Sequence, residues 1–401
     1  MKDFKTINEL KIYRGVKFAG ILSRTEFGCT FTFDESFLKD PEFQSLAFKM
    51  PKGNIPFKID GVNLHPFFAN LLPEGMRLKA ILSNLKTSPD DLFSLFAAVS
   101  SNTIGDVYAK AEVDSKNSFE TPKLKNIDFS EYFKKITGFN SYASGEDAIA
   151  GVQEKLSASM ISFPLNIAKS DKSYILKLNP KDKPNLVENE FYSMALAKKC
   201  KIQIAKVKIV RDKNKKSGLL VERFDRIQMG QKTHFLHQED LCQVLGIYAS
   251  EKYRVSFSDL IKGVKPFVTA ESASSLKMIK LYCFSYLLGN GDLHAKNISL
   301  LVQPSGLIDL SPAYDLLCSF IYGDHNMAVK FDGKDNNIKF KQVTEFAERF
   351  GVKKVLVEKM LLSLVKDFSK NYLILKNIKM TKKTWDALEK TIQKRIKDLS
   401  N

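Results

Sequence analysis

Cysteines and long apolar runs are both scarce in this 401-residue sequence. Its five cysteines include no C-x-x-C pair and have no histidine at zinc-ligand spacing, so we expect neither a structural zinc site nor a disulfide framework. No stretch approaches the roughly 18 consecutive apolar residues that span a bilayer. The first residues mix charged with apolar side chains, unlike a secretory signal peptide. We therefore expect a cytoplasmic protein with reduced, mostly buried thiols.

Phosphate-binding motifs are also sparse. The sequence contains no G-x4-G-K-[ST] loop, which excludes a P-loop nucleotide hydrolase. The segment 149–155, IAGVQEK, has one glycine where eukaryotic protein kinases have three, so it is weak evidence for a glycine-rich loop. We still take this segment as the candidate phosphate-covering loop, with Val152 as a nucleotide contact.

Positive charge, in contrast, is in excess. The chain has 62 lysines and arginines against 45 aspartates and glutamates, a formal net charge of +17. One interpretation is a polyanionic partner. The other is that lysines spread along the chain simply solvate its surface, because no run combines dense basic residues with the interleaved aromatics of a nucleic-acid groove reader. The charge alone leaves both interpretations open.

The pattern of apolar residues changes along the chain and predicts an α+β protein. Residues 1–64 alternate apolar with polar side chains, as short strands do, and residues 65–85 have apolar side chains at helical spacing. A strand, strand, helix, strand, strand series then predicts a small antiparallel sheet, and helical patterns dominate from His237 onward. The predicted parts are an N-terminal subdomain, a polar linker, a sheet-containing lobe and a helical lobe, at residues 1–111, 112–128, 129–230 and 231–401.

The segment 289–315 carries the residues most informative about chemistry. Asp292 is followed five residues later by Asn297, just before a predicted strand, and Asp315 follows the returning strand. Phosphoryl transfer of the protein-kinase type needs a carboxylate that accepts the acceptor's hydroxyl proton, plus an amide oxygen and a second carboxylate that hold Mg²⁺. We assign Asp292 as the catalytic base and Asn297 and Asp315 as metal ligands. Alternatively, all three are turn or cap residues that satisfy backbone groups.

Two upstream residues favour the kinase interpretation. Lys177 lies within the apolar strand pattern YILKL, where a lysine costs free energy unless its ammonium group reaches an anion. Glu190 follows on a predicted helix, and protein kinases fix ATP with a strand lysine held by a helix glutamate. The alternatives are that Lys177 reaches past a sheet edge to solvent and that Glu190 is an exposed helix residue.

The segment 218–226, GLLVERFDR, leaves the small sheet just before the helical half, where a kinase hinge presents backbone groups to adenine. The Glu222 carbonyl and the Phe224 amide are the candidate adenine contacts, and Asp225 is placed to reach the ribose. Alternatively, the charged side chains of residues 222 to 226 form a local ion-pair cluster. The backbone role does not depend on which side-chain interpretation holds.

Taken together, these motifs resemble the HipA family of serine/threonine kinase toxins over nearly the whole chain. They are HPFFANLLPEG (65–75), GDVY (105–108), AGVQEK (150–155), YILKLNP, VENEFY, VERFDR, QEDLCQVLG (238–246), GDLHAKN and SPAYDL. The resemblance implies a two-lobed protein-kinase-like fold, with a small antiparallel-sheet N-lobe and a helical C-lobe, preceded by a β-rich subdomain. It also implies ATP and Mg²⁺ as cofactors, a helix-turn-helix antitoxin that represses its operon by binding operator DNA, and a protein substrate such as an aminoacyl-tRNA synthetase.

The resemblance also transfers residue roles. Lys177 and Asp225 become nucleotide contacts, Asp292 the base, and Asn297 and Asp315 the Mg²⁺ ligands. His294, inside the catalytic loop, resembles a ribose or phosphate neighbour, with a structural role equally open. One position departs from the family: its toxins carry an autophosphorylated serine where this chain has Ala148, which has no hydroxyl. We therefore expect this chain to lack that phosphorylation switch.

The sequence is also compatible with two other classes of function. GDLHAKN also resembles the catalytic loop of small-molecule phosphotransferases of the aminoglycoside or choline kinase kind. A corepressor that binds an antitoxin and DNA would use the positive charge, but it would not require an intact set of kinase residues. HPFFANLLPEG and VERFDR favour the toxin kinase.

Overall fold

The computed structural model describes residues 4–61, 64–110, 127–137, 160–167, 172–180, 183–230 and 232–400. The candidate phosphate loop lies outside these residues, so the predictions for Val152 and Ala148 are not tested by the structure. None of the described helices is both long and apolar enough to cross a membrane.

The N-terminal part contains a five-stranded antiparallel sheet with strand order β6-β3-β2-β1-β7. In β1, Leu10 and Ile12 are buried while Glu9 and Lys11 are exposed, the alternation expected of a strand with one face on a core. The strands predicted in this region are confirmed. The strands and the small hairpin beside them are β1 (Glu9–Arg14), β2 (Lys17–Thr25), β3 (Gly28–Phe33), β4 (Ser45–Ala47), β5 (Met50–Pro51), β6 (Phe57–Asp60) and β7 (Val107–Lys110).

Helices α1 (Glu35–Leu38), α2 (Pro66–Ala69) and α4 (Leu92–Val99) contribute side chains to the hydrophobic core of this sheet. Helix α3 (Gly75–Leu85) instead contributes Ala80 to the core of the second sheet. The helical spacing predicted over 65–85 is real, but the helix is interrupted: α2 ends at Ala69 and α3 begins at Gly75. Pro73 lies between them, and proline has no backbone N–H to donate within a helix. The break leaves a non-helical segment, residues 70–74, that contacts the helical part of the molecule.

The second part is a four-stranded antiparallel sheet, β10-β11-β9-β8, with helix α7 against one face. Leu176 and Leu178 of β9 belong to the hydrophobic cluster on one face of this sheet. Because side chains alternate along a strand, Lys177 points to the other face, toward α7. The elements are α5 (Phe129–Thr137), β8 (Ile161–Asn166), β9 (Ser173–Leu178), α7 (Leu186–Lys199), β10 (Val207–Arg211) and β11 (Ser217–Glu222).

The remaining part is mainly helical and forms the largest hydrophobic core. Its central helix α10 buries most of its length, including Tyr282 and Tyr286. The elements are β12 (Arg226–Met229), β13 (Lys232–Phe235), β14 (Gln238–Asp240), α8 (Leu241–Leu245), α9 (Phe257–Val264), α10 (Glu271–Leu288), β15 (Ser299–Val302), β16 (Ile308–Leu310), α11 (Phe340–Arg349), α12 (Lys354–Asn371) and α13 (Lys382–Asp398).

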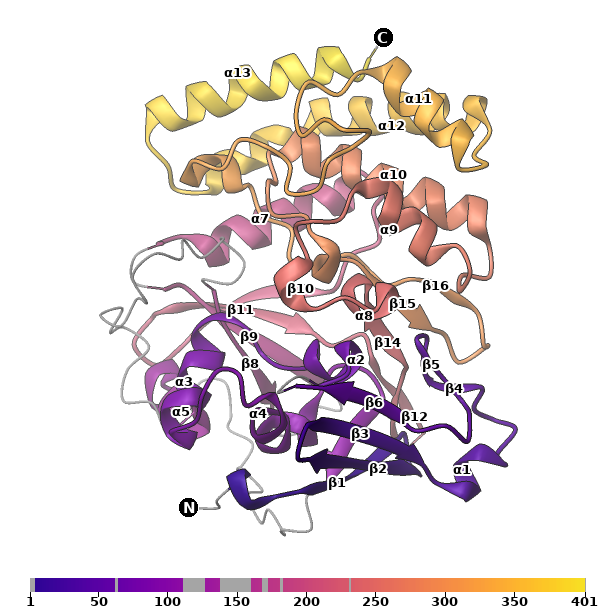
Figure 1. Cartoon of the computed structure of the whole chain (residues 1–401). Helices are drawn as coiled ribbons and strands as arrows, with labels where there is room; N and C mark the ends of the chain where they lie inside the picture. The colour runs from indigo at the N-terminus through magenta and orange to yellow at the C-terminus, as the bar shows by residue number, and fades with distance from the viewer. Residues whose placement is uncertain are drawn as a thin grey trace.

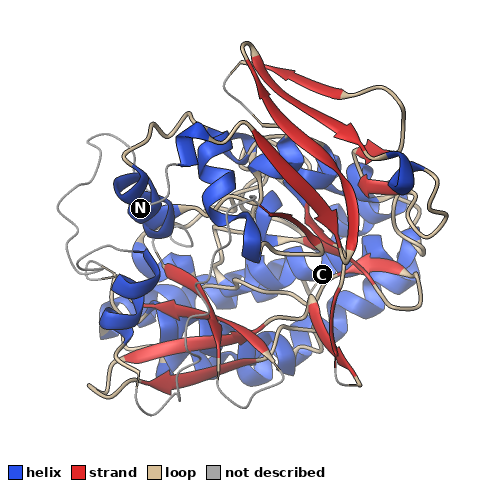
Figure 2. Ribbon diagram, turned by 90° about the horizontal axis from the view of Figure 1, so that it is seen from below, coloured by secondary structure: helices blue, strands red, loops and turns tan. Residues whose placement is uncertain are grey.

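The three parts stack in order. In Figure 1 the N-terminal strands lie at one end, the helices α10 to α13 at the other, and the sheet β8 to β11 between them. Figure 2, coloured by secondary structure, shows the N-terminal sheet and the four-stranded sheet as separate groups of strands. The predicted α+β architecture, with a small antiparallel sheet and a helical lobe, is confirmed.

A buried histidine joins the N-terminal part to the helical part. The two ring nitrogens of His237 lie 2.6 Å from Asp106 Oδ1 and 2.8 Å from Glu239 Oε1. Ionised carboxylates only accept hydrogen bonds, so this geometry favours an imidazole that carries a proton on both ring nitrogens. Burial alone would lower the pKa of His237, and Arg14 acts in the same direction, but the two carboxylates outweigh them and raise it.

This histidine makes the stability of the protein depend on pH. A group whose pKa is raised by folding stabilises the folded state fully below its ordinary pKa, near 6.5, and less as the pH rises through the raised value. We expect the unfolding temperature of the parent to fall above pH 6.5 relative to His237→Gln. At pH 6 the variant should be less stable by about 3 kcal/mol, because two buried carboxylates lose their shared partner.

Thermal unfolding between pH 6 and 9 measures this difference. His234→Gln is the matched control, because His234 is exposed on β13. Parallel pH profiles for the parent and His237→Gln would show that the buried imidazole is not charged.

Candidate active site

A cavity of about 300 Å³ lies where the three parts of the chain meet. Among the predicted site residues, those that line it are Lys177, Glu222, Phe224, Asp225, Asn297 and Asp315. Glu190, Asp292 and His294 are buried beside this set and are not part of the cavity lining. The fold thus gathers residues that are more than a hundred positions apart in the sequence.

Lys177 is the centre of a buried charge cluster. Its ammonium group lies 2.8 Å from both carboxylate oxygens of Glu190 and 2.9 Å from Asp315 Oδ1. Glu190 is fully buried, so the alternative of an exposed helix residue is wrong, and Lys177 is too buried to reach solvent past a sheet edge. Burial opposes the charge on Lys177, but Asp315 and Glu190 together raise its pKa. Burial, reinforced by Asp315, raises the pKa of Glu190 despite the lysine.

The candidate catalytic loop, residues 290–297, is held from several directions. Tyr253 donates its hydroxyl to Asp292 Oδ1 at 3.0 Å, and Asn290 Oδ1 accepts from the Asp292 amide at 3.0 Å. His294 Nε2 lies 4.0 Å from Asp292 Oδ1, and its ring packs edge-on against Tyr253. This packing matches the structural alternative for His294, whose nucleotide contact stays a prediction.

Asn297 is oriented by the same loop. Its Nδ2 donates to the Asp292 carbonyl at 2.9 Å, which fixes the amide. No residue in the described part of the chain donates to its Oδ1, which lies in the cavity wall with Asp315. An amide oxygen and a carboxylate are hard oxygen donors, the kind that bind Mg²⁺ together with substrate phosphates. The two residues therefore fit the predicted metal-binding role.

No ready-made metal cage is present in the described segments. Among them, no three histidine, cysteine, aspartate or glutamate side chains are grouped so as to hold an ion. Mg²⁺ is usually bound by one or two protein ligands, with phosphate oxygens and water completing its octahedron. A pair of protein donors, Asn297 and Asp315, would fit that arrangement.

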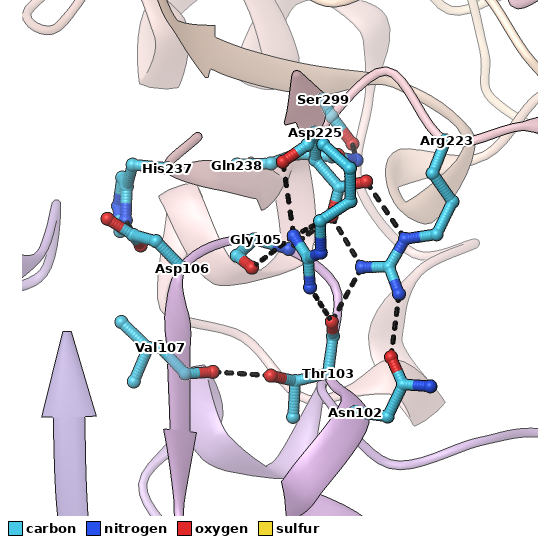
Figure 3. A network of polar contacts seen from close by, with 11 residues as sticks. Asn102, Thr103, Gly105, Asp106, Val107, Arg223, Asp225, His237, Gln238 and Ser299 are labelled. Carbon is cyan, nitrogen blue, oxygen red and sulfur yellow. Dashed lines mark hydrogen bonds and ion pairs between the residues drawn. The ribbon is translucent and has the colours of Figure 1, made fainter. Parts of the chain in front are cut away.

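The Asp225 carboxylate is fully engaged within the protein (Figure 3). Its Oδ1 accepts from Arg223 Nε at 3.0 Å, and its Oδ2 accepts from Arg223 Nη2, Arg226 Nη1 and the Gly105 amide at 2.6 to 2.8 Å. Asp225, Arg223 and Arg226 thus form the local ion-pair cluster that the sequence offered as an alternative. Burial would raise the pKa of Asp225, but the arginines and the Gly105 amide lower it. The predicted ribose contact stays a prediction.

Glu222 does not belong to this cluster, contrary to the sequence-based alternative. It pairs with Lys172 at 2.9 Å and with Lys206 at 3.5 Å. The Phe224 amide, in contrast, has no hydrogen-bond acceptor within the described residues, and Phe224 lines the cavity. An uncommitted backbone donor at this position is what adenine recognition by a hinge requires.

The N-terminal part makes polar contacts on both sides of the cavity. On the hinge side, Arg223 and Arg226 donate to the Thr103 carbonyl at 2.7 and 2.8 Å. Gly105 makes this approach possible, because its φ is +81° and an added Cβ would lie 2.9 Å from the Gln238 carbonyl oxygen. Figure 3 shows the loop carrying Asn102 to Asp106 packed against this hinge.

On the catalytic-loop side, the segment between α2 and α3 makes the contact. Lys296 Nζ lies 2.7 Å from Asp240 Oδ2 and 3.0 Å from the Asn70 carbonyl oxygen, and Lys252 Nζ lies 2.9 Å from Glu74 Oε2. These contacts were not predicted. The motifs HPFFANLLPEG and QEDLCQVLG, which carry the family resemblance, also supply part of the cavity wall.

Both ends of the chain match models of one protein family. The model described as HipA-like C-terminal domain matches residues 148–372, and the HipA N-terminal domain model matches residues 10–110. The serine/threonine-protein kinase toxin HipA of Shewanella oneidensis is 30% identical over 317 residues, covering 73% of this chain and 72% of the toxin.

The fold agrees with a solved structure. The Shewanella oneidensis complex of HipA, HipB and operator DNA contains a chain that superimposes with a TM-score of 0.73 at 22% identity. The match covers 97% of this chain and 96% of that one. The predicted two-lobed, kinase-like architecture is thereby confirmed. With its lysine-centred cavity, its N- and C-terminal domain models and this toxin as a relative, the chain belongs to the HipA family.

Proposed function

We propose that this chain is an ATP-dependent serine/threonine protein kinase and the toxin of a toxin-antitoxin pair. The observation that carries the proposal is that Lys177, which lines the cavity, bonds to both Glu190 and Asp315. A strand lysine held by a helix glutamate, next to a metal-binding carboxylate, is the arrangement that protein kinases use to fix ATP. The proposed acceptor is a translation component such as an aminoacyl-tRNA synthetase, following the family resemblance.

Each residue has a defined task in this mechanism. The Phe224 amide donates to adenine, the Glu222 carbonyl accepts from it, and Lys177 orients the phosphates. Asn297 and Asp315 would hold Mg²⁺, which neutralises phosphate charge when bound. Asp292 accepts the proton of the acceptor hydroxyl as the phosphoryl group transfers. The bond that Tyr253 makes to Asp292 Oδ1 fixes the carboxylate for that step.

The proposed partners are a helix-turn-helix antitoxin and, through it, operator DNA. The related structure contains HipA, HipB and operator DNA. The net charge of +17 on this chain suits a complex that lies close to a polyanion. A corepressor without kinase activity would have the same partners, so activity must be tested separately from DNA binding.

A small-molecule phosphotransferase is the alternative enzyme class. Phosphoproteomic comparison of cells expressing the parent or Asp292→Asn separates the two, because only a protein kinase leaves phosphoserine or phosphothreonine that depends on Asp292. It also identifies the acceptor protein. No difference in protein phosphorylation between the two strains would favour the small-molecule alternative.

The two carboxylates of the site should fail in different ways. Asp292→Asn removes the base but no predicted nucleotide contact, so we expect protein phosphorylation to fall at least about 100-fold while Mg²⁺-ATP binding is retained. Asp315→Asn removes a charged metal ligand, so we expect weaker Mg²⁺-ATP binding as well. Phosphotransfer assays and calorimetric titration of both variants measure this. Near-normal phosphotransfer by Asp292→Asn would contradict its assignment.

The charge should affect DNA binding by the antitoxin complex. If basic side chains of this chain contact DNA phosphates, the complex should bind operator DNA more tightly than the antitoxin alone. The slope of log K against log salt should also steepen by about 0.9 for each added phosphate contact. Fluorescence anisotropy between 50 and 200 mM salt measures both quantities. An unchanged slope would leave the basic surface with a solubility role only.

A further inference from the structure

Arg77 lies in the cavity wall without a balancing charge. It is the third residue of α3, in the N-terminal part, and lines the same cavity as Lys177 and Phe224. Its side chain is only partly buried, so a molecule in the cavity can reach it. The segment that carries it is fixed in place, because Glu74, the residue before α3, is paired with Lys252.

The other charged side chains that line the cavity are all engaged. Each of them takes part in one of the ion pairs given above, centred on Lys177, Glu222, Asp225, Lys296 and Lys252. Across the described residues, Arg77 forms neither an ion pair nor a side-chain hydrogen bond. Its hydrogen-bond donors are therefore available to a ligand.

An unbalanced guanidinium group in this place costs free energy. Burial, with the nearby positive charge of Arg223, lowers the pKa of Arg77 to about 10, so the group still carries its charge at neutral pH. Desolvating a charge is unfavourable unless an opposite charge compensates it. A bound anion would supply that compensation.

The cavity also needs another cation if a nucleotide is to bind there. Lys177 is paired with two carboxylates, Glu190 and Asp315, so its positive charge is already engaged within the protein. A triphosphate beside it requires positive charge from elsewhere. Mg²⁺ supplies part of that charge, and Arg77 is the uncommitted cation that the wall itself offers.

We propose that Arg77 binds a phosphate group of the nucleotide, so that the N-terminal part contributes directly to the kinase site. The proposal rests on the proposed function, because it assumes a nucleotide in this cavity. The planar guanidinium fork can donate two parallel hydrogen bonds to one phosphate, which a lysine cannot do. An acidic group on the acceptor protein could use the same fork, and the experiment distinguishes the two sources.

The test compares full-length Arg77→Gln, Arg77→Lys and Lys58→Gln with the parent. Lys58 is exposed on β6 and lies outside the cavity, so its variant controls for the loss of one positive charge in the same part of the chain. Calorimetric titration with Mg²⁺ and a non-hydrolysable ATP analogue, and separately with adenosine, gives the affinities. Circular dichroism and thermal unfolding verify that each variant is folded.

We expect Arg77→Gln to weaken binding of the ATP analogue about tenfold and Arg77→Lys to weaken it less, with adenosine and the Lys58→Gln control unchanged. Affinities of Arg77→Gln for the analogue within twofold of the parent would overturn the proposal. If phosphotransfer to protein then fell at saturating ATP, the arginine would belong to acceptor recognition instead. A parent that bound neither the analogue nor adenosine would instead refute the proposed function.

Discussion

The buried contact of Lys177 with Glu190 and Asp315 is the constraint on which the rest of the site depends. It joins β9, α7 and the loop after β16, so it ties the small sheet to the helical part. Charges of both signs are removed from water here, which is unfavourable unless the geometry is good and the remaining hydrogen bonds are made. Asp315 adopts a left-handed backbone conformation, with φ of +57°, in presenting its carboxylate to the lysine. Strained or uncommon backbone of this kind tends to occur at functional sites.

The N-terminal part is an integral wall of the same site. It contacts the hinge through Thr103 and Gly105, and the catalytic loop through Asn70, so both ends of the cleft are fixed from outside the kinase lobes. Removal of this part would leave Arg223 and His237 buried with fewer partners. A molecule that binds to the N-terminal part therefore has a physical route to the cavity.

Local sequence patterns predicted the lysine cluster but not the contacts between the parts. A lysine inside an apolar strand needs an anion, and the kinase arrangement of strand lysine and helix glutamate indicated Glu190 as its partner. The contact of Lys177 with Asp315 was not predicted. The partners of Asp225 include the Gly105 amide, 120 positions away, and no local pattern indicates such a contact. The sequence offered both a ribose role for Asp225 and a local ion-pair cluster, but it did not indicate that the N-terminal part completes that cluster.

The break between α2 and α3 was also not predicted from local sequence patterns. Apolar spacing alone extended one helical pattern through Pro73, although proline disfavours a helix interior. The break matters because it produces the segment that carries Asn70, Glu74 and Arg77 into the cavity wall. Asn70 is bound by Lys296, which lies 226 positions away in the sequence. The role of Asn70 in the site therefore depends on tertiary structure.

The most direct test of the central claim is nucleotide binding by the double variant Lys177→Met/Glu190→Gln. Neutralising both residues avoids leaving the fully buried Glu190 as an uncompensated charge, which would destabilise the fold for an unrelated reason; Asp315 keeps its charge but is partly exposed. If Lys177 orients the phosphates, the folded double variant should bind Mg²⁺ with a non-hydrolysable ATP analogue at least about tenfold more weakly than the parent. Affinity equal to the parent in a folded double variant would contradict the account.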